Sequence, residues 1–418
     1  MSKLFIPTVN VGLAHEADIY CLELSQPFTI TAGGDGVLKL WKNKILEGQL
    51  PKEHVYTLNV NQVGIHHAHY LHYIEPVDQK EIFLVACVGF NGSLHLYEFD
   101  LTEKKFHNLS ESVKFSGAKD EAGSQLGIDF NESFWSVKFV PKDLINGIET
   151  HKLVLATVEG SLISYNFEYL SGEQSFSKDE VTHSEFSFKN KQKINTLTKI
   201  NKSDGFPLAL DCNNVRKIIT MGYSNGEVLI LELQTLRTLF NISLSPYPVR
   251  NLKVSHDGKL LSIAHDMGSY GRMSLVDTDY GEHLGDYTVA THSATAAGSA
   301  TTNESLIGFA HNKWVLQNDF NESDEFCISG GLDGKLRVWN TIKRERVSTL
   351  NMSNLDIEDE TKILTHDEHN NNLDNPGILG CKYIPKNYRG GMGSDSNEGL
   401  VVVCLDRSVR WYREAGGI

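Results

Sequence analysis

The sequence has no run of about 18 apolar residues, no CxxC pair and no dense cluster of lysine and arginine with interleaved aromatic residues. The first absence excludes a membrane-spanning helix. The opening stretch, MSKLFIPTVNVG, is broken by Pro7 and Asn10 and is followed by no small-residue cleavage site, so we expect no secretory signal peptide. The six cysteines stand apart from one another, most of them in apolar runs, which is typical of reduced cysteines in a cytosolic or nuclear protein.

Charge adds a further exclusion. The formal net charge is −14, with 39 lysine and arginine residues against 53 aspartate and glutamate residues. An acidic chain repels phosphate backbones and anionic lipid surfaces, so we expect no direct nucleic-acid or membrane contact. Apolar residues make up 40% of the chain, enough for a sizeable folded core.

One short phrase recurs along the chain. GGDGVLKLW (33–41) is nearly repeated as GGLDGKLRVW (330–339), and related phrases end at Tyr97, Tyr165, Leu231, Val276 and Tyr412. Each contains a turn residue followed by an alternating apolar run, which predicts a tight hairpin and a half-buried strand. Recurrence of one supersecondary unit indicates a repeat architecture, whose units stack to bury their faces.

Each unit has further strands before the turn. A continuous apolar run such as FLVACVG predicts a strand buried on both faces, and an alternating run such as IYCLEL precedes it. With a more variable outer strand, each unit becomes a four-stranded antiparallel sheet. The turn residues of the seven units are Gly36, Gly92, Gly160, Gly226, Gly271, Gly334 and Arg407.

Seven such sheets fit an all-β, seven-bladed β-propeller. We expect a single propeller over residues 1–418, with blades at about 15–50, 60–110, 130–175, 205–240, 245–290, 308–350 and 376–413. The chain ends soon after the third strand of the seventh unit, which would leave an exposed sheet edge. We therefore predict that the N-terminal strand, residues 3–9, completes the last blade and closes the ring.

Two units carry the same polar set. His15, Asp35 and Trp41 recur as His311, Asp333 and Trp339, with six residues from aspartate to tryptophan in both units. The set resembles the WD40 repeat, whose histidine, aspartate and tryptophan form a hydrogen-bond network within a blade through a serine or threonine. A histidine–aspartate pair is also compatible with triad chemistry, but recurrence in two blades favours a structural network.

Longer stretches resemble the family of propeller subunits of the fungal Superkiller (Ski) complex. They include AHEADIY, IAHDMGSYGRMSLVDTDYGEHLG, GLDGKLRVWNTIKRERVSTLNM, DNPGILG and GMGSDSNEGLVVVCLDRSVRWYREAGG. The resemblance covers nearly the whole chain and is thin from about residue 100 to 204 and in THSATAAGSATTNES.

The resemblance implies a non-catalytic scaffold. Members of that family bind a tetratricopeptide-repeat subunit alongside a DExH RNA helicase, in a cytoplasmic complex that feeds mRNA to the exosome for 3′-to-5′ decay and restrains double-stranded RNA viruses. They also act in the nucleus during meiosis, where they bind the topoisomerase-like protein that makes double-strand breaks. A substrate adaptor of a ubiquitin ligase or chromatin complex is the alternative within the class of binding proteins.

The residues that begin the innermost strands are the candidate partner-binding site. Register places them at the rim of the central channel, where a contiguous apolar patch marks an interaction surface. They are Tyr20, His66, Trp135, Leu208, Arg250, Leu316 and Leu379, with Asp18 and Trp314 close by. We expect a partner segment to pack an apolar side chain on Trp135 and Tyr20 and to pair a basic residue with Asp18; in the alternative interpretation, Trp135 and Trp314 only pack between blades.

Two further possibilities are weaker. A propeller hydrolase needs converging carboxylates or a nucleophile–base pair, and the inner strands offer no second acid near Asp18. His67 and His69 share a strand face in GIHHAHYLHY, yet no cysteine or carboxylate completes a zinc set at a suitable spacing. We therefore expect no enzyme activity, metal or cofactor. The sequence leaves open the roles of the inserts 291–305 and 351–376.

Overall fold

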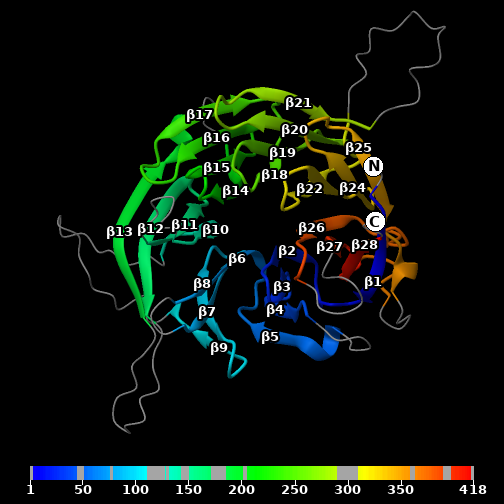
Figure 1. Cartoon of the computed structure of the whole chain (residues 1–418), viewed down its shortest axis with the longest axis horizontal. Coiled ribbons are helices and arrows are strands. Elements are labelled where there is room, and N and C mark those ends of the chain that lie inside the picture. The colour runs from blue at the N-terminus through cyan, green and yellow to red at the C-terminus, as the bar shows by residue number, and fades with distance from the viewer. Residues whose placement is uncertain are drawn as a thin grey trace, which may run out of the picture.

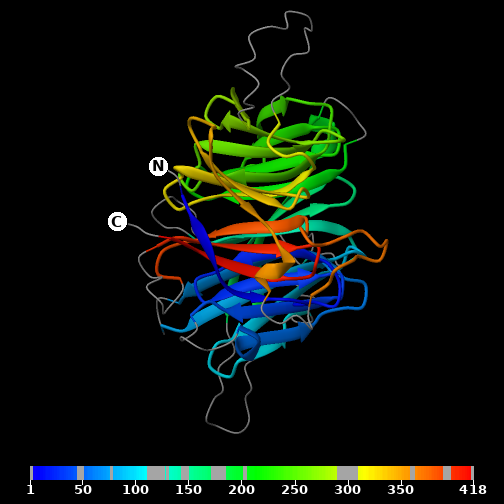
Figure 2. The ribbon, with the colours of Figure 1, turned by 90° about the vertical axis from the view of Figure 1, so that its right-hand side faces the viewer.

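The structure is a computed structural model. It describes residues 3–44, 51–75, 79–110, 128, 131–142, 150–170, 185–200, 205–289, 309–357, 363–388 and 397–415, with the side chains of 170, 185–187 and 189–190 left aside. The described strands form seven four-stranded antiparallel sheets arranged as blades around a central axis (Figure 1). Seen from the side, the sheets form a thick disc (Figure 2). The predicted seven-bladed β-propeller is confirmed.

The first three blades follow one another along the chain. Blade 1 contains β2 (Ile19–Leu24), β3 (Phe28–Gly33), β4 (Val37–Lys42) and β5 (Val55–Asn59). Blade 2 contains β6 (Ile65–Ile74), β7 (Glu81–Gly89), β8 (Leu94–Asp100) and β9 (Lys105–Asn108). Blade 3 contains β10 (Phe134–Val140), β11 (His151–Thr157), β12 (Ser161–Leu170) and β13 (Glu185–Asn195).

The next three blades repeat this order from the axis outward. Blade 4 contains β14 (Pro207–Asn213), β15 (Ile218–Tyr223), β16 (Glu227–Glu232) and β17 (Thr238–Ser243). Blade 5 contains β18 (Val249–Val254), β19 (Leu260–Asp266), β20 (Gly271–Asp277) and β21 (His283–Tyr287). Blade 6 contains β22 (Val315–Phe320), β23 (Phe326–Gly331), β24 (Lys335–Asn340) and β25 (Arg346–Asn351). Among the described residues, three short 3-10 helices lie in connections, at Pro51–His54 (η1), Thr196–Lys199 (η2) and Asn354–Asp356 (η4).

Blade 7 joins the two ends of the described chain. Its strands are β26 (Ile378–Ile384), β27 (Gly399–Cys404), β28 (Val409–Glu414) and, on the outside, β1 (Phe5–Val11). β1 pairs antiparallel with β28, from Phe5 opposite Glu414 to Val11 opposite Val409, and the two strands lie side by side in Figure 1. The predicted closure by the N-terminal strand is therefore confirmed, because β1 is the fourth strand of the blade 7 sheet.

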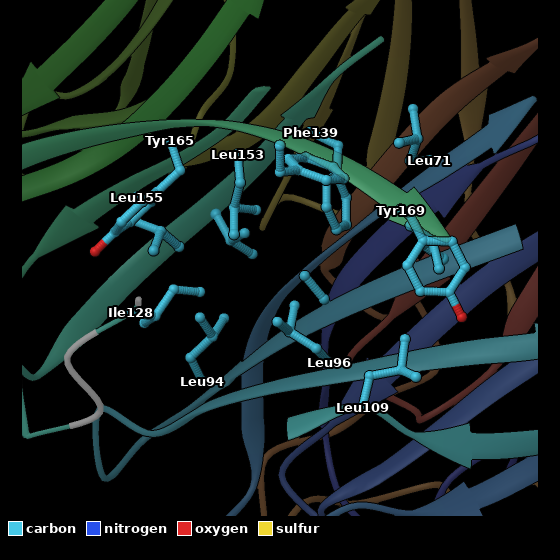
Figure 3. Close-up of a cluster of buried hydrophobic side chains, with 14 of the residues drawn as sticks. Leu71, Leu94, Leu96, Leu109, Ile128, Phe139, Leu153, Leu155, Tyr165 and Tyr169 are labelled. Carbon is cyan, nitrogen blue, oxygen red and sulfur yellow. The ribbon is translucent and has the colours of Figure 1, made fainter. Parts of the chain in front are cut away.

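The core lies between the blades. In the described part of the chain the buried apolar side chains form seven clusters, and each cluster draws its members from two neighbouring blades. Figure 3 shows the cluster between blades 2 and 3, where Leu94 and Leu96 of β8 face Leu153 and Leu155 of β11. The second strands of the blades are buried on both faces, as their continuous apolar runs predict.

The turn between the second and third strands has the backbone that the repeat requires, except in blade 5. Gly36 and Gly334 have φ values of 71° and 70°, and Arg407 takes the same left-handed conformation at 61° in blade 7. In blade 5 the sequence prediction of Gly271 as the turn residue is wrong: Gly271 begins β20, and Gly268 has the positive φ of 81°. The left-handed residue is the second of the four residues between β19 and β20, whereas Gly92 is the third of the four between β7 and β8.

Candidate partner-binding site

A β-bulge marks the start of every innermost strand. The register of each innermost strand against the second strand slips by one residue, as between Ile19 and Cys21 in blade 1. A bulge leaves one residue unpaired and turns its side chain away from the regular ladder. The seven bulged residues are Tyr20, His66, Trp135, Leu208, Arg250, Leu316 and Leu379. These are the seven rim residues expected from the sequence, and the structure brings all of them into the lining of one cavity of about 370 Å³ at the channel mouth.

Aromatic rings from four blades follow one another along this mouth. Tyr20 of blade 1 meets the edge of Phe90 at 5.2 Å between ring centroids, and Phe90 lies 5.0 Å from His66 of blade 2. His66 stacks on Trp135 of blade 3 at 4.3 Å and 27°, and Trp135 meets Phe206 at the start of blade 4 at 4.9 Å. We call these five residues the aromatic arc. Sequence reasoning missed Phe90 and Phe206, although each is the single aromatic residue in its loop.

The arc is partly open to solvent. Tyr20 and Phe90 are each 47% exposed, which is unusual for large aromatic side chains in adjacent positions. More apolar side chains are exposed on loops at the same end of the channel, before the innermost strands or in the turns after the second strands: Leu13, Val63, Val158 and Tyr247. Apolar exposure gathered on one face is typical of a protein-binding surface.

The opposite side of the mouth carries an ion-paired arginine. The guanidinium of Arg250 lies 4.7 Å from the ring centroid of Trp314 and donates a 2.8 Å hydrogen bond from Nε to Asp266. Trp314 donates from Nε1 to the carbonyl of Gly268 at 2.6 Å. Trp314 therefore joins blade 6 to blade 5 and at the same time holds Arg250 in place at the mouth. A planar cation stacked on an indole is a common hot-spot arrangement.

Asp18 lies beside the arc, outside the cavity lining. Its nearest cation is Arg407, whose Nε is 3.9 Å from the Asp18 carboxylate, and Arg407 also reaches Glu368 of the 351–376 insert at 3.2 Å. Burial raises the pKa of Asp18, and the neighbouring carboxylates add to this effect against the opposing charge of Arg407. Asp18 thus has a guanidinium and two carboxylates as its charged neighbours.

The described part of the 351–376 insert is fastened to blade 7. The buried guanidinium of Arg410 donates to the carbonyl of Ser353 and pairs with Asp406, and it lies 3.5 Å from Asp356. Asn354 is bonded to Asp374 at 3.0 Å, which ties the two ends of the insert together. The insert 291–305 lies outside the described residues.

Trp135 serves both of the roles weighed from the sequence. Its indole Nε1 donates to the carbonyl of Leu208 at 3.2 Å, so it links blade 3 to blade 4. Its ring also lines the mouth cavity and is only half-buried. Packing between blades and availability to a partner are therefore compatible in one side chain.

The two repeated polar sets form networks inside blades 1 and 6. In blade 1, His15 Nδ1 lies 2.9 Å from Asp35, while Thr31 Oγ1 lies 2.8 Å from both His15 Nε2 and Trp41 Nε1. The indole N–H donates to the hydroxyl, the hydroxyl donates to the imidazole, and the imidazole donates to the carboxylate. Burial lowers the pKa of His15 despite Asp35, so the imidazole is neutral in this chain of bonds.

Blade 6 repeats the network with one addition. His311 lies 2.9 Å from Asp333 and 2.7 Å from Ser329 Oγ, which also accepts from Trp339 at 2.8 Å. Arg337 approaches Asp333 at 3.0 Å. In both blades the network joins the turn to the second and third strands. Its residues lie outside the lining of the mouth cavity, so its histidine and aspartate stabilise the blade.

A ring of mostly charged side chains lines the channel below the mouth. Its members stand three residues after the bulged residue of each blade, and they are Glu23, His69, Lys138, Asp211, Lys253, Asp319 and Lys382. Lys138 Nζ is 3.1 Å from Glu23 and 3.8 Å from Asp211, and Lys382 Nζ is 2.8 Å from Glu23. Three carboxylates face three ammonium groups, so the ring is balanced. Sequence reasoning missed it, although the constant offset of three was readable.

The ring also holds neighbouring blades in register. The amide of Phe139 donates to His69 at 3.1 Å, that of Val254 to Asp211 at 2.9 Å, and that of Tyr383 to Asp319 at 2.9 Å. Burial lowers the pKa of His69 to about 3, which keeps this ring member neutral. In the described chain no group of three histidine, cysteine, aspartate or glutamate side chains is arranged to hold a metal ion. No helix in the same residues has the length and apolarity to cross a bilayer.

Comparison with known proteins agrees with this geometry. Residues 304–340 match the WD40 family, described as "WD domain, G-beta repeat". Over 425 aligned positions, covering 100% of both chains, the sequence is 37% identical to "Antiviral protein SKI8" of Saccharomyces cerevisiae. The chain belongs to the SKI8 family of WD40 propellers.

Membership in the SKI8 family indicates a non-catalytic scaffold that works through protein–protein contacts. In this chain the blade frame, the intrablade networks and the charged ring support the propeller. The mouth, with its aromatic arc, is the candidate surface for such contacts.

Proposed function

We propose that this chain is the propeller scaffold of a Ski complex, in which it binds a tetratricopeptide-repeat subunit beside a DExH RNA helicase. In that complex it supports exosome-mediated 3′-to-5′ decay of mRNA and antiviral defence. The same chain binds the topoisomerase-like protein of meiotic double-strand breaks, and it works in the cytoplasm and the nucleus. The full-length similarity to a protein named "Antiviral protein SKI8" supports this assignment.

The observation that carries the proposal is the aromatic arc at the channel mouth, in which Tyr20 and Phe90 are each 47% exposed. A partner segment lies across the mouth, packs an apolar side chain against Tyr20 and Trp135, and presents a basic residue to Asp18. Aromatic anchors surrounded by less exposed contacts concentrate binding energy at the centre of an interface. Leu208, Leu316 and Leu379 line the far side of the same cavity and exclude water from the seated segment.

The test measures binding of the purified tetratricopeptide-repeat subunit to arc variants. Tyr20 and Phe90 are the sharpest probes because each is 47% exposed, whereas Trp135 also links two blades. Replacing both by alanine should weaken binding by about 30-fold or more, as expected for central aromatic anchors. The matched control is Tyr280→Ala, which removes a 73% exposed aromatic from the β20–β21 turn and should leave binding unchanged.

Equal binding by the wild type and the double variant would remove the mouth as the docking surface. A complementary experiment is affinity purification of the full chain followed by mass spectrometry. Recovery of the repeat subunit and the helicase supports the Ski assignment. Recovery of ubiquitin-ligase subunits or histone-modifying subunits in their place would favour the adaptor alternative.

A further inference from the structure

His66 and His67 form a hydrogen-bonded pair at the floor of the mouth. Their Nδ1 atoms are 2.6 Å apart, which requires one ring to donate and the other to accept. His66 Nε2 lies 3.1 Å from the carbonyl oxygen of Gly89. A carbonyl oxygen can only accept, so His66 carries its hydrogen on Nε2 and its Nδ1 is the acceptor. His67 must then donate from Nδ1.

This assignment leaves His67 with a lone pair on Nε2. Burial lowers the pKa of His66 to about 4, and burial together with the charge of Lys138 holds the pKa of His67 well below its ordinary value. Both rings are therefore neutral at pH 7. Each ring thus carries one N–H group and one nitrogen lone pair, as the assignment requires. Within the described residues His67 Nε2 has no hydrogen-bond partner, and His67 lines the mouth cavity.

The pair is also held rigidly. His66 stacks on Trp135 at 4.3 Å, and the ring of His67 meets the edge of Trp135 at 5.9 Å and 62°. The acceptor thus has a fixed place beneath the aromatic arc, where apolar surface excludes water once a partner is seated. A buried acceptor without a donor destabilises a complex, whereas a fixed acceptor that is satisfied adds specificity.

We propose that His67 Nε2 accepts a hydrogen bond from an N–H or O–H group that the bound partner segment carries next to its apolar anchor. This inference rests on the proposed function, because it specifies the chemistry of the segment that occupies the same mouth. It makes the site selective: a segment with the apolar anchor alone leaves the His67 lone pair buried and unpaired. An apolar surface without this acceptor would not distinguish such a segment from one that carries both the anchor and an N–H or O–H donor.

Two conservative variants separate the acceptor role from a purely positional one. In H67N the amide nitrogen can still donate to His66 from the position of Nδ1, while the acceptor at the position of Nε2 is gone. In H67Q the side-chain oxygen reaches the position of Nε2, while the bond to His66 is lost. We expect H67N to bind the purified tetratricopeptide-repeat subunit about tenfold or more weakly than the wild type, and H67Q to stay within about threefold.

The outcomes decide between the roles. Wild-type affinity in H67N overturns the proposal, and so does an equal loss in both variants, which would mean that His67 only orients its neighbours. Thermal melting of each variant checks the fold. Histidine-selective 15N labelling of the wild type gives a second measurement that needs no substitution: the His67 Nε2 resonance should shift on binding, and an unchanged resonance overturns the proposal. Absence of binding by the wild type would overturn the proposed function as well.

Discussion

Removing the negative charge of Glu23 should destabilise the propeller strongly, even though the side chain lies inside a polar channel. Burial alone would raise the pKa of Glu23, but Lys138 and Lys382 outweigh burial and hold that pKa well below its ordinary value. Their ammonium groups are 3.1 and 2.8 Å from the carboxylate. Glu23→Gln keeps the shape and leaves two largely buried ammonium groups with less compensating charge.

The expected loss of stability follows from the burial of the two lysine partners of Glu23. Breaking a buried ion pair by removing one partner costs about 3–5 kcal/mol. For 418 residues, an unfolding entropy of about 2.1 cal/mol/K per residue gives about 0.9 kcal/mol per kelvin. E23Q should therefore lower Tm by about 3–6 °C in differential scanning calorimetry at pH 7.

A surface pair provides the control. Arg216 and Asp279 form an ion pair at 2.9 Å with side chains 35% and 43% exposed, so Asp279→Asn should cost at most about 1 kcal/mol, or about 1 °C. Replacing Lys382 by methionine in the E23Q background should recover part of the loss, because one uncompensated charge is removed. A Tm for E23Q within 1 °C of the wild type would refute the argument that the ring depends on balanced charge.

The Tm difference between the wild type and E23Q should depend on pH in one direction. The folded-state pKa of Glu23 is depressed, so its contribution to stability is present above the unfolded pKa of about 4.3 and is lost as the pH falls through the folded pKa. The Tm difference between the wild type and E23Q should be full at pH 7 and should shrink below about pH 4.

Three further predictions concern the frame. Thr31→Val removes the hydroxyl that joins the indole and imidazole of the blade 1 network. It should lower the free energy of unfolding by about 1–3 kcal/mol for each group left unpaired. Thr31→Ser keeps the hydroxyl and should stay near the wild-type Tm. The hydrogen bond to Asp324 raises the pKa of His256 in the folded state. The contribution of His256 to the stability of the fold is therefore full below the unfolded pKa and is lost as the pH rises through the folded pKa. H256Q should lower Tm more at about pH 6 than at about pH 8. Gly36→Ala places a Cβ 1.9 Å from the carbonyl oxygen of Asn61 at a φ of 71°, and should lower the free energy of unfolding by more than about 1 kcal/mol in urea titration.

Much of the frame could be predicted from local patterns. The alternating runs IYCLEL and VRNLKV are β2 and β18 to the residue, and the recurring turn phrase predicts the hairpins between second and third strands. Strand alternation has a period of two, and a turn needs a left-handed residue, so both leave a mark in a few neighbouring letters. Gly271 shows the limit of local patterns, because a glycine near a turn can be the first residue of the next strand instead of the left-handed residue of the turn.

The sequence alone determined the number of blades, their closure by the N-terminal strand and the seven positions at the rim, because each depends on short repeated segments and on counting between them. The tertiary structure decided how those positions act together. Three contacts join residues from different blades: His66 stacks on Trp135, Tyr20 meets Phe90, and Lys382 of blade 7 pairs with Glu23 of blade 1. Distances of this kind depend on how the closed ring curves and how each bulge turns its side chain, and no local pattern carries that information.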